Sequence, residues 1–297
     1  MFDTIPQLDC AGRILKLDRP QVMGIVNVTP DSFSEGGAHA GVDAAVAHGL
    51  RLVEEGADLL DIGGESTRPG AGEVDVDEEL RRVLPVIERL AAQVAVPISI
   101  DTSKSEVMRA AVAVGAGMIN DVHGLRREGA LDVAAMLGVP VVLMHMQGEP
   151  RSMQDAPDYD DVVAEVHRFL VERIFVAEMA GIAKKNIVVD PGFGFGKNTQ
   201  HNLQLLAQLQ RFTELGVPVL AGLSRKKTIG ELTGRAEPRE RVFGSVAAHL
   251  IAAPRGAMLL RVHDVAATVD ALKVWNALAA VPMPRVESKP AIHWPDD

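Results

Sequence analysis

The chain has 297 residues, of which 47% are hydrophobic, and its formal net charge at pH 7 is −10. That length suits either two ordinary domains or one large α/β barrel. So acidic a chain is a poor candidate for a nucleic-acid-binding protein, because such proteins gain much of their affinity by neutralising phosphates. An anionic substrate would require positive side chains gathered locally against an unfavourable overall field.

Targeting signals and cysteine content bear on the cellular compartment in which the protein is expected. The first residues show neither the basic region nor the long apolar region of a signal peptide. No run of about 18 apolar residues could form a transmembrane helix. The single cysteine, Cys10, excludes an internal disulfide framework. We therefore expect a reducing compartment, the cytoplasm.

A regular pattern of strands and helices begins at residue 21. Residues 1–20 are weakly patterned and predict at most a short strand pair that leads into the domain. Beyond them, short apolar runs recur, and each is followed by a helical pattern. The predicted strands cover residues 22–26, 59–62, 97–100, 117–119, 139–144, 187–189, 217–223 and 257–260.

These alternating units predict the fold class. Among the helices, one is opened by Asp75 and Asp77, and a long amphipathic one covers 159–180. Eight βα units over about 250 residues predict a single-domain (β/α)8 TIM barrel at 21–280, with its active site at the carboxyl ends of the strands. An open doubly wound sheet is the alternative, but no glycine fingerprint follows the first strand. We expect residues 281–297 to form a flexible tail.

Polar side chains follow the predicted strands, and a barrel would bring them to one mouth. They are Asn27, Asp61, Asp101, Asn120, Asp190, Lys226, Arg261 and His263. Each carboxylate also has a local interpretation: Asp61 as a turn former, Asp101 as a helix cap, and Asp190 as an Asx-turn that ends its strand. A barrel does not need so many charged groups in its mouth, so the set predicts a ligand site.

The residue types at the mouth indicate the class of ligand. Carboxylates and amides suit a planar heterocycle with an amino-pyrimidinone edge, because a carboxylate can accept two parallel N–H bonds. Arg261 and His263, two apart on one strand, are predicted to form a cationic pair suited to phosphate or sulfate. Arg225, Lys226 and Lys227 add positive charge nearby. The residues themselves do not name the reaction.

Three other interpretations have less support. The spacing of Gly192–Lys197 matches neither a Walker P-loop nor a Rossmann turn. His145 and His263 lack the compact cluster that a zinc site needs. Ser224 has no G-x-S-x-G context, which disfavours a hydrolase nucleophile.

Several long, non-repetitive blocks resemble dihydropteroate synthase. They are GIVNVTPDSFSEGG at 24–37, DIGGESTRPG at 61–70 and DPGFGFGK at 190–197, with shorter ones at 100–104, 119–121, 144–148, 224–226 and 261–263. The resemblance runs in order from about residue 22 to residue 278. It implies a transferase of folate biosynthesis that condenses 6-hydroxymethyl-7,8-dihydropterin pyrophosphate with 4-aminobenzoate, in an SN1-like reaction, to give 7,8-dihydropteroate and pyrophosphate. It also implies sulfonamides as competitors.

The resemblance also implies roles for single residues. The catalytic residues would be Asp101, Asp190, Lys226, Arg261 and His263. The pterin would contact Asp101, Asn120, Met144, Asp190 and Lys226. The pyrophosphate would contact Asn27, Arg68, Arg261 and His263, with a Mg2+ ion held partly by Asn27. The aminobenzoate would contact Phe33, Thr67, Arg68, Pro69, Phe195, Lys226 and Lys227. Lys227 stands where Ser or Arg is common, so sulfonamide affinity does not follow from the resemblance.

Assembly and rival functions complete the expectations. The resemblance implies a homodimer built from the last helices, where residues 245–253 form a small-residue apolar face, although such a face can also simply pack on the barrel. One rival is a methyltetrahydrofolate:corrinoid methyltransferase domain, which would not need the first loop or the Ser-Arg-Lys block. Another is a non-catalytic pterin-binding paralogue, which loss of Lys226 or Arg261 would favour; both residues are present.

Overall fold

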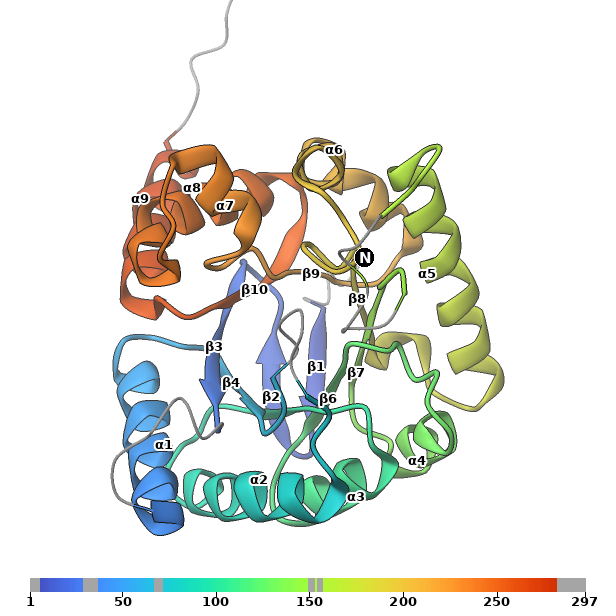
Figure 1. Cartoon of the computed structure of the whole chain (residues 1–297), viewed down its shortest axis with the longest axis vertical. Helices are drawn as coiled ribbons and strands as arrows, with labels where there is room; N and C mark the ends of the chain where they lie inside the picture. Colours follow the sequence, from blue (N-terminus) through green and yellow to red (C-terminus); the bar gives the residue numbers. More distant parts are fainter. Residues whose placement is uncertain (1–5, 29–36, 67–71, 149–152, 154–156, 282–297) are drawn as a thin grey trace, which may run out of the picture.

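The computed structural model describes residues 6–28, 37–66, 72–148, 153 and 157–281. Within these residues the chain forms a closed barrel of eight parallel strands surrounded by helices (Figure 1). The predicted TIM barrel is confirmed. Around the barrel the strands are β3 (Gln21–Asn27), β4 (Leu59–Gly63), β5 (Ile98–Asp101), β6 (Met118–Asp121), β7 (Val141–Met144), β8 (Ile187–Asp190), β9 (Val219–Ala221) and β10 (Ala257–Val262), and β10 pairs with β3 to close the ring.

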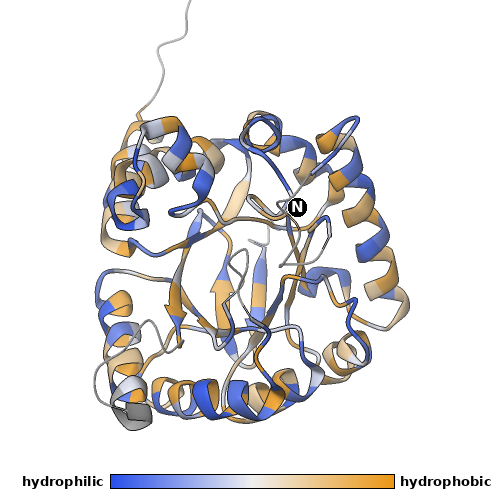
Figure 2. Ribbon diagram, viewed as in Figure 1, coloured by the Kyte–Doolittle hydropathy of each residue, from blue (hydrophilic) through white to orange (hydrophobic). Residues whose placement is uncertain are grey.

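Helices follow the strands and cover the barrel. They are α1 (Gly37–Glu54), α2 (Val76–Ala91), α3 (Ser105–Ala113), α4 (Ala130–Leu137), α5 (Val162–Met179), α6 (Thr199–Ala207), α7 (Lys227–Thr233), α8 (Val242–Ala252) and α9 (Val265–Ala279). They carry hydrophilic and hydrophobic residues side by side (Figure 2). The buried apolar ones, such as Ile87 of α2, pack with strand residues such as Ile62 and Ile98 in one core. Among the described helices, none combines the length and apolar character that a bilayer crossing needs.

Side-chain caps set the start of two helices. Asp75 accepts a hydrogen bond from the backbone N of Glu78 at 2.7 Å, so α2 begins where the sequence predicts. The long helix expected over 159–180 begins instead at Val162. Asp161 fixes that start, because its Oδ1 accepts from the backbone N of Val163 and of Ala164, both at 3.0 Å.

A hairpin closes the amino end of the barrel. The strand pair expected before residue 20 is present as antiparallel β1 (Gln7–Cys10) and β2 (Arg13–Lys16). The buried side chains of Leu8, Cys10 and Leu15 in the hairpin, and of Leu17 just after it, pack against residues near the beginnings of the barrel strands. These strand residues are Met23, Leu59, Met118, Val142, Val188, Leu220 and Leu259. The backbones fit closely, since a Cβ on Gly117 would lie 2.3 Å from the carbonyl oxygen of Cys10. The carboxyl ends of the strands therefore form the end at which a ligand can enter.

Candidate active site

At the carboxyl ends of the strands, one hydrogen-bonded network joins β4, β5, β6 and β10. Arg261 donates from Nε to Asp61 Oδ2 and from Nη2 to Asp101 Oδ2, both at 2.6 Å. Asn120 donates from Nδ2 to the same Asp61 oxygen at 3.0 Å. The parallel pairing of neighbouring strands brings these ends together: Asp101 pairs with Asn120 of β6 and with Gly63 of β4, two residues after Asp61.

Asp61 is the functional residue that the sequence interpretation undervalued. It lies inside β4, fully buried, so the turn-former interpretation is wrong. Its Oδ2 binds two side chains of the site, and its Oδ1 has no hydrogen-bond partner among the described residues. The position of Asp61 could have indicated this role in the sequence. A carboxylate two residues before the end of a buried strand must face either the barrel interior or the helices, and in both places it needs a polar partner.

Asp101 belongs to the site and not to a helix cap. The residue preceding α3 is Lys104, which makes no side-chain capping bond, so the capping interpretation of Asp101 is wrong. Burial raises the pKa of Asp101 to about 7, Arg261 opposes this, and Asp61 adds to it. Burial would lower the pKa of Arg261, but the carboxylates of Asp61 and Asp101 raise it above its ordinary value. Arg261 is therefore a permanent cation between two acidic groups.

Asp190 ends β8, and its carboxylate is held by the loop that follows. Its Oδ1 accepts from the backbone N of Gly192 at 2.7 Å, so the Asx-turn is present and orients the carboxylate. Burial raises the pKa of Asp190, while the Gly192 N–H and the Lys226 ammonium lower it. A Cβ on Gly222 would lie 3.9 Å from Asp190 Oδ2 and 4.0 Å from Arg261 Cβ, so both side chains lie against this glycine.

A small apolar cluster forms a further wall of the site. Its members are Val122, Met144, Met146, Met153 and Phe195. The Nζ of Lys226 lies 4.1 Å from the centroid of the Phe195 ring, within cation–π distance. Burial, and next the charge of Arg261, lower the pKa of Lys226 to about 8. An apolar wall with a few fixed polar groups suits a planar heterocycle.

Two further predicted site residues, Asn27 and His263, have different surroundings. A Cβ on Gly63 would lie 3.8 Å from Asn27 Oδ1 and 3.7 Å from Asp101 Oδ2, so Asn27 lies beside the carboxylate network. The backbone N of His263 donates to Ser224 Oγ at 3.1 Å, and its Nδ1 lies 2.9 Å from the same oxygen. Ser224 is therefore a partner of His263.

Lys227 differs from the residues of this network because its side chain faces solvent. Its side chain is 85% exposed and forms a helical ion pair with Glu231 at 3.4 Å. The neighbouring Lys226 is partly buried against Phe195. The predicted contacts Phe33, Thr67, Arg68 and Pro69 lie outside the described residues.

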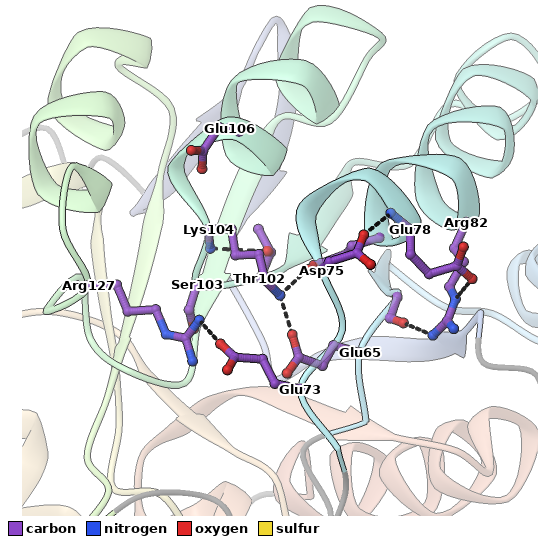
Figure 3. Close-up of polar contacts among 12 residues, drawn as sticks. Glu65, Glu73, Asp75, Glu78, Arg82, Thr102, Ser103, Lys104, Glu106 and Arg127 are labelled. Carbon is purple, nitrogen blue, oxygen red and sulfur yellow. Dashed lines mark hydrogen bonds and ion pairs between the residues drawn. The ribbon is translucent and has the colours of Figure 1, made fainter.

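The described residues on either side of 67–71 are tied to their surroundings by polar contacts (Figure 3). Lys104, just after Asp101-Thr102-Ser103, contacts Glu65 and the fully buried Glu79, the latter at 2.5 Å. Arg82 Nη1 donates to the Gly64 carbonyl at 2.8 Å. On the other side, Arg127 pairs with Glu73 at 2.8 Å. The sequence interpretation did not identify these ion pairs, because partners such as Lys104 and Glu79 belong to different βα units.

Asn27 is the predicted Mg2+ ligand, and its chemistry fits that ion. Mg2+ takes oxygen ligands and often binds through one or two protein groups together with substrate phosphates and waters. The Asn27 carboxamide oxygen, at the end of β3, is an oxygen ligand of this kind. Among the described residues, no group of three or more His, Cys, Asp or Glu side chains is arranged to hold a metal.

Comparison with known proteins identifies the family. The sequence-family model of the pterin-binding enzymes matches residues 23–263 of this chain. Dihydropteroate synthase of Escherichia coli K12 is 54% identical over 271 residues, which cover 91% of this chain and 96% of the relative. Two structures of the Xanthomonas albilineans dihydropteroate synthase are similar to this one. The one solved with 4-aminobenzoic acid has a TM-score of 0.90 at 76% identity and covers 94% of this chain and 100% of that one. The one solved with 7,8-dihydropteroate has a TM-score of 0.87 at 73% identity, covering 93% and 100%. The chain therefore belongs to the pterin-binding enzymes and, among them, to the dihydropteroate synthases.

Proposed function

We propose that this chain condenses 6-hydroxymethyl-7,8-dihydropterin pyrophosphate with 4-aminobenzoate, giving 7,8-dihydropteroate and pyrophosphate. The observation that carries the proposal is the network of Arg261 with Asp61 and Asp101. This network lies at the carboxyl ends of the strands, where a barrel enzyme holds its reacting groups. Family membership supports the reaction, and this geometry supports the assignment of these groups to it.

Binding of the pterin is assigned to the inner part of the site. Asp101 and Asp190 offer carboxylate oxygens and Asn120 an amide, which together suit the N–H and carbonyl edge of the ring. Lys226 can donate to a ring carbonyl from its position over Phe195. Met144 and Phe195 would contact the face of the ring. Together these contacts are expected to orient the reacting CH2 group of the pterin.

Departure of pyrophosphate requires positive charge at the mouth of the barrel. Arg261 is a permanent cation, and we assign it, with His263, to the departing anion. A Mg2+ ion held partly by Asn27 would add charge stabilisation to the pyrophosphate when bound. Loss of the anion from an electron-rich dihydropterin leaves a delocalised cation, which the carboxylates of Asp101 and Asp190 would stabilise.

Attack by 4-aminobenzoate completes the reaction. The arylamine nitrogen is weakly basic and loses its proton readily after attack, so the mechanism needs no strong general base. Phe33, Thr67, Arg68, Pro69, Phe195, Lys226 and Lys227 are proposed to shape this substrate's site. Sulfonamides, which resemble aminobenzoate, are expected to compete for it.

The test is pyrophosphate release by the purified chain, measured with both substrates and Mg2+ and again with each component omitted. We expect release only in the complete mixture, together with formation of dihydropteroate. Tight pterin binding without release would contradict the proposal and indicate a non-catalytic pterin-binding paralogue. Activity that is unchanged after Arg261→Ala would contradict the role assigned to that residue.

We further propose a homodimer formed through the last helices. Phe243 of α8 and Val274 and Leu278 of α9 are large apolar side chains that are at least 70% exposed. An apolar face of this kind is typical of a subunit interface. Sedimentation should give twice the chain mass, and Phe243→Asp should shift it toward the monomer. A monomeric wild-type chain would contradict the proposal.

A cytoplasmic location is also proposed. Cys10 is buried and forms no disulfide, as suits a reducing compartment. Cell fractionation that recovered the protein outside the cytoplasm would contradict it.

A further inference from the structure

One buried lysine near the site has no role in the mechanism above. Lys197 follows the glycine-spaced loop after β8, and its side chain is only 2% exposed. Its Nζ donates to the carbonyl oxygens of Gly192 at 3.0 Å and Phe195 at 2.9 Å. It also lies 2.9 Å from Nδ1 of His145, in the loop after β7. One amino group therefore joins two points of its own loop to the neighbouring loop.

The ring of His145 is the acceptor in the third contact. Burial first, and the nearby Lys197 next, lower the pKa of His145 to about 2, so the ring is neutral. A neutral imidazole can present Nδ1 as an acceptor to an N–H of Lys197. Burial lowers the pKa of Lys197 to about 7, and the charge of Asp190 opposes this. The N–H groups of Lys197 have three acceptors within 3.0 Å, and the His145 carbonyl oxygen lies 3.4 Å away, so the buried amino group is satisfied by neutral partners.

The loop that Lys197 holds is the one that shapes the proposed pterin site. The Gly192 backbone N donates to Asp190 Oδ1 at 2.7 Å, while the Gly192 carbonyl accepts from Lys197 at 3.0 Å. The Phe195 carbonyl also accepts from Lys197, and the Phe195 ring faces Lys226. The groups that fix the Asp190 carboxylate and the Phe195 ring thus share one anchor.

The loop cannot relax easily toward another arrangement with its neighbours in place. Gly192, Gly194 and Gly196 all have positive φ angles, of 72°, 77° and 61°. A Cβ on Gly192 would lie 1.9 Å from the His145 carbonyl oxygen, and one on Gly196 would lie 2.4 Å from that of Gln147. The loop therefore lies in direct backbone contact with the loop after β7, at the point where Lys197 bridges the two.

We propose that Lys197 is a positioning residue of the reaction, whose buried amino group sets the orientation of Asp190 and Phe195 toward the substrates. This inference rests on the proposed function. When Lys197 is protonated, its electrostatic effect has the same direction, because its charge lowers the pKa of Asp190 and so favours the carboxylate. Lys197 itself touches no substrate in this proposal and acts through the two residues that do.

Lys197→Met tests the proposal, with Lys185→Met as the matched control. Lys185 is an exposed lysine that lies just before β8, at the opposite end of the same strand. We expect Lys197→Met to lower kcat/KM by about 10- to 100-fold, with KM raised for both substrates, because small displacements of positioning groups have effects of this size. Titration with 7,8-dihydropteroate should show weaker binding by Lys197→Met than by Lys185→Met.

The kinetics are measured well below the melting temperature of each variant, so that a purely structural role would leave them unchanged. A lower melting temperature with wild-type kcat and KM would overturn the proposal. If Lys197→Met does not fold, Lys197→Gln takes its place, and a decrease of at least about threefold is expected because a shorter neutral donor reaches fewer acceptors. If neither variant folds, Lys197 is a folding residue and the proposal is wrong. Absence of dihydropteroate formation by wild type and Lys185→Met would instead contradict the proposed function.

Discussion

The guanidinium Nε of Arg261 lies 2.6 Å from Oδ2 of the fully buried Asp61, a residue 200 positions away in the sequence. The same Asp61 oxygen accepts from Asn120 at 3.0 Å. One carboxylate therefore orients both the proposed anion-binding cation and a proposed pterin-binding amide. Its removal should affect stability and activity together.

Asp61→Ala should lower the free energy of unfolding by about 3–5 kcal/mol, because it leaves the Arg261 charge without one of its two partners. Asp270→Ala is the control: its ion pair with Lys273, at 3.2 Å, is largely exposed, and the expected change is within about 0.5 kcal/mol. Urea denaturation at pH 7 measures both. In the folded Asp61 variant, kcat/KM should also fall at least tenfold, and a wild-type value would contradict the orienting role.

The pH dependence of kcat/KM for the pterin substrate should be bell-shaped. Activity should rise as Asp101, with a pKa of about 7, loses its proton, and fall as Lys226, with a pKa of about 8, loses its charge. Initial rates at constant ionic strength would measure the profile. Asp101→Asn should abolish the acid limb in whatever activity remains. A flat profile across both pKa values would contradict the assignment.

Asp101 should also make stability depend on pH. Its pKa is raised from 3.8 to about 7 in the folded chain, so between these values the folded state binds more protons than the unfolded state. Stability from this group is therefore lost as the pH rises from 4 to 7. Relative to wild type, Asp101→Asn should gain stability over that interval in urea denaturation. A difference that is constant with pH would contradict the raised pKa.

Gly192→Ala should destabilise the chain more than Gly138→Ala. Both glycines have similar positive φ angles, of 72° and 67°, so the backbone strain is matched. A Cβ on Gly138 meets no described atom within 4 Å, whereas on Gly192 it would lie 1.9 Å from the His145 carbonyl oxygen. We expect about 1 kcal/mol for Gly138→Ala and about 3 kcal/mol or more for Gly192→Ala. Equal losses in denaturant unfolding would contradict the close loop contact.

Lys104→Met should lower the free energy of unfolding by about 3–5 kcal/mol, because Glu79 would stay buried without its cation. Adding Glu79→Leu should recover most of that loss, since apolar groups can replace a buried ion pair at little cost. Arg127→Met is the control: it removes the more exposed pair with Glu73 and should change stability by about 1 kcal/mol or less. A double variant no more stable than Lys104→Met would show that the Glu79 charge is not the cause.

Much of the fold could be predicted from the sequence because the relevant signals are local. Apolar runs such as residues 187–189 predict buried strands, Asp75 marks the start of α2, and the alternation of the two patterns leaves few arrangements other than the barrel. Polar residues at strand ends, such as Asp101 and Asp190, could be placed at one mouth for the same reason. Their role in the site remained a prediction, because a single strand end also permits a cap or a turn.

Which atoms meet was decided only by the tertiary structure. Asp61 binds Arg261 because β10 closes on β3, and β3 in turn pairs with β4, which makes the last barrel strand a near neighbour of the second. Lys197 meets His145 because two neighbouring loops pack backbone against backbone. These contacts join residues far apart in sequence, and a change of register moves side chains to other positions, so local pattern carries no information about them. The sequence by itself determined the barrel and the polar residues at its mouth, whereas barrel closure decided which side chains pair there.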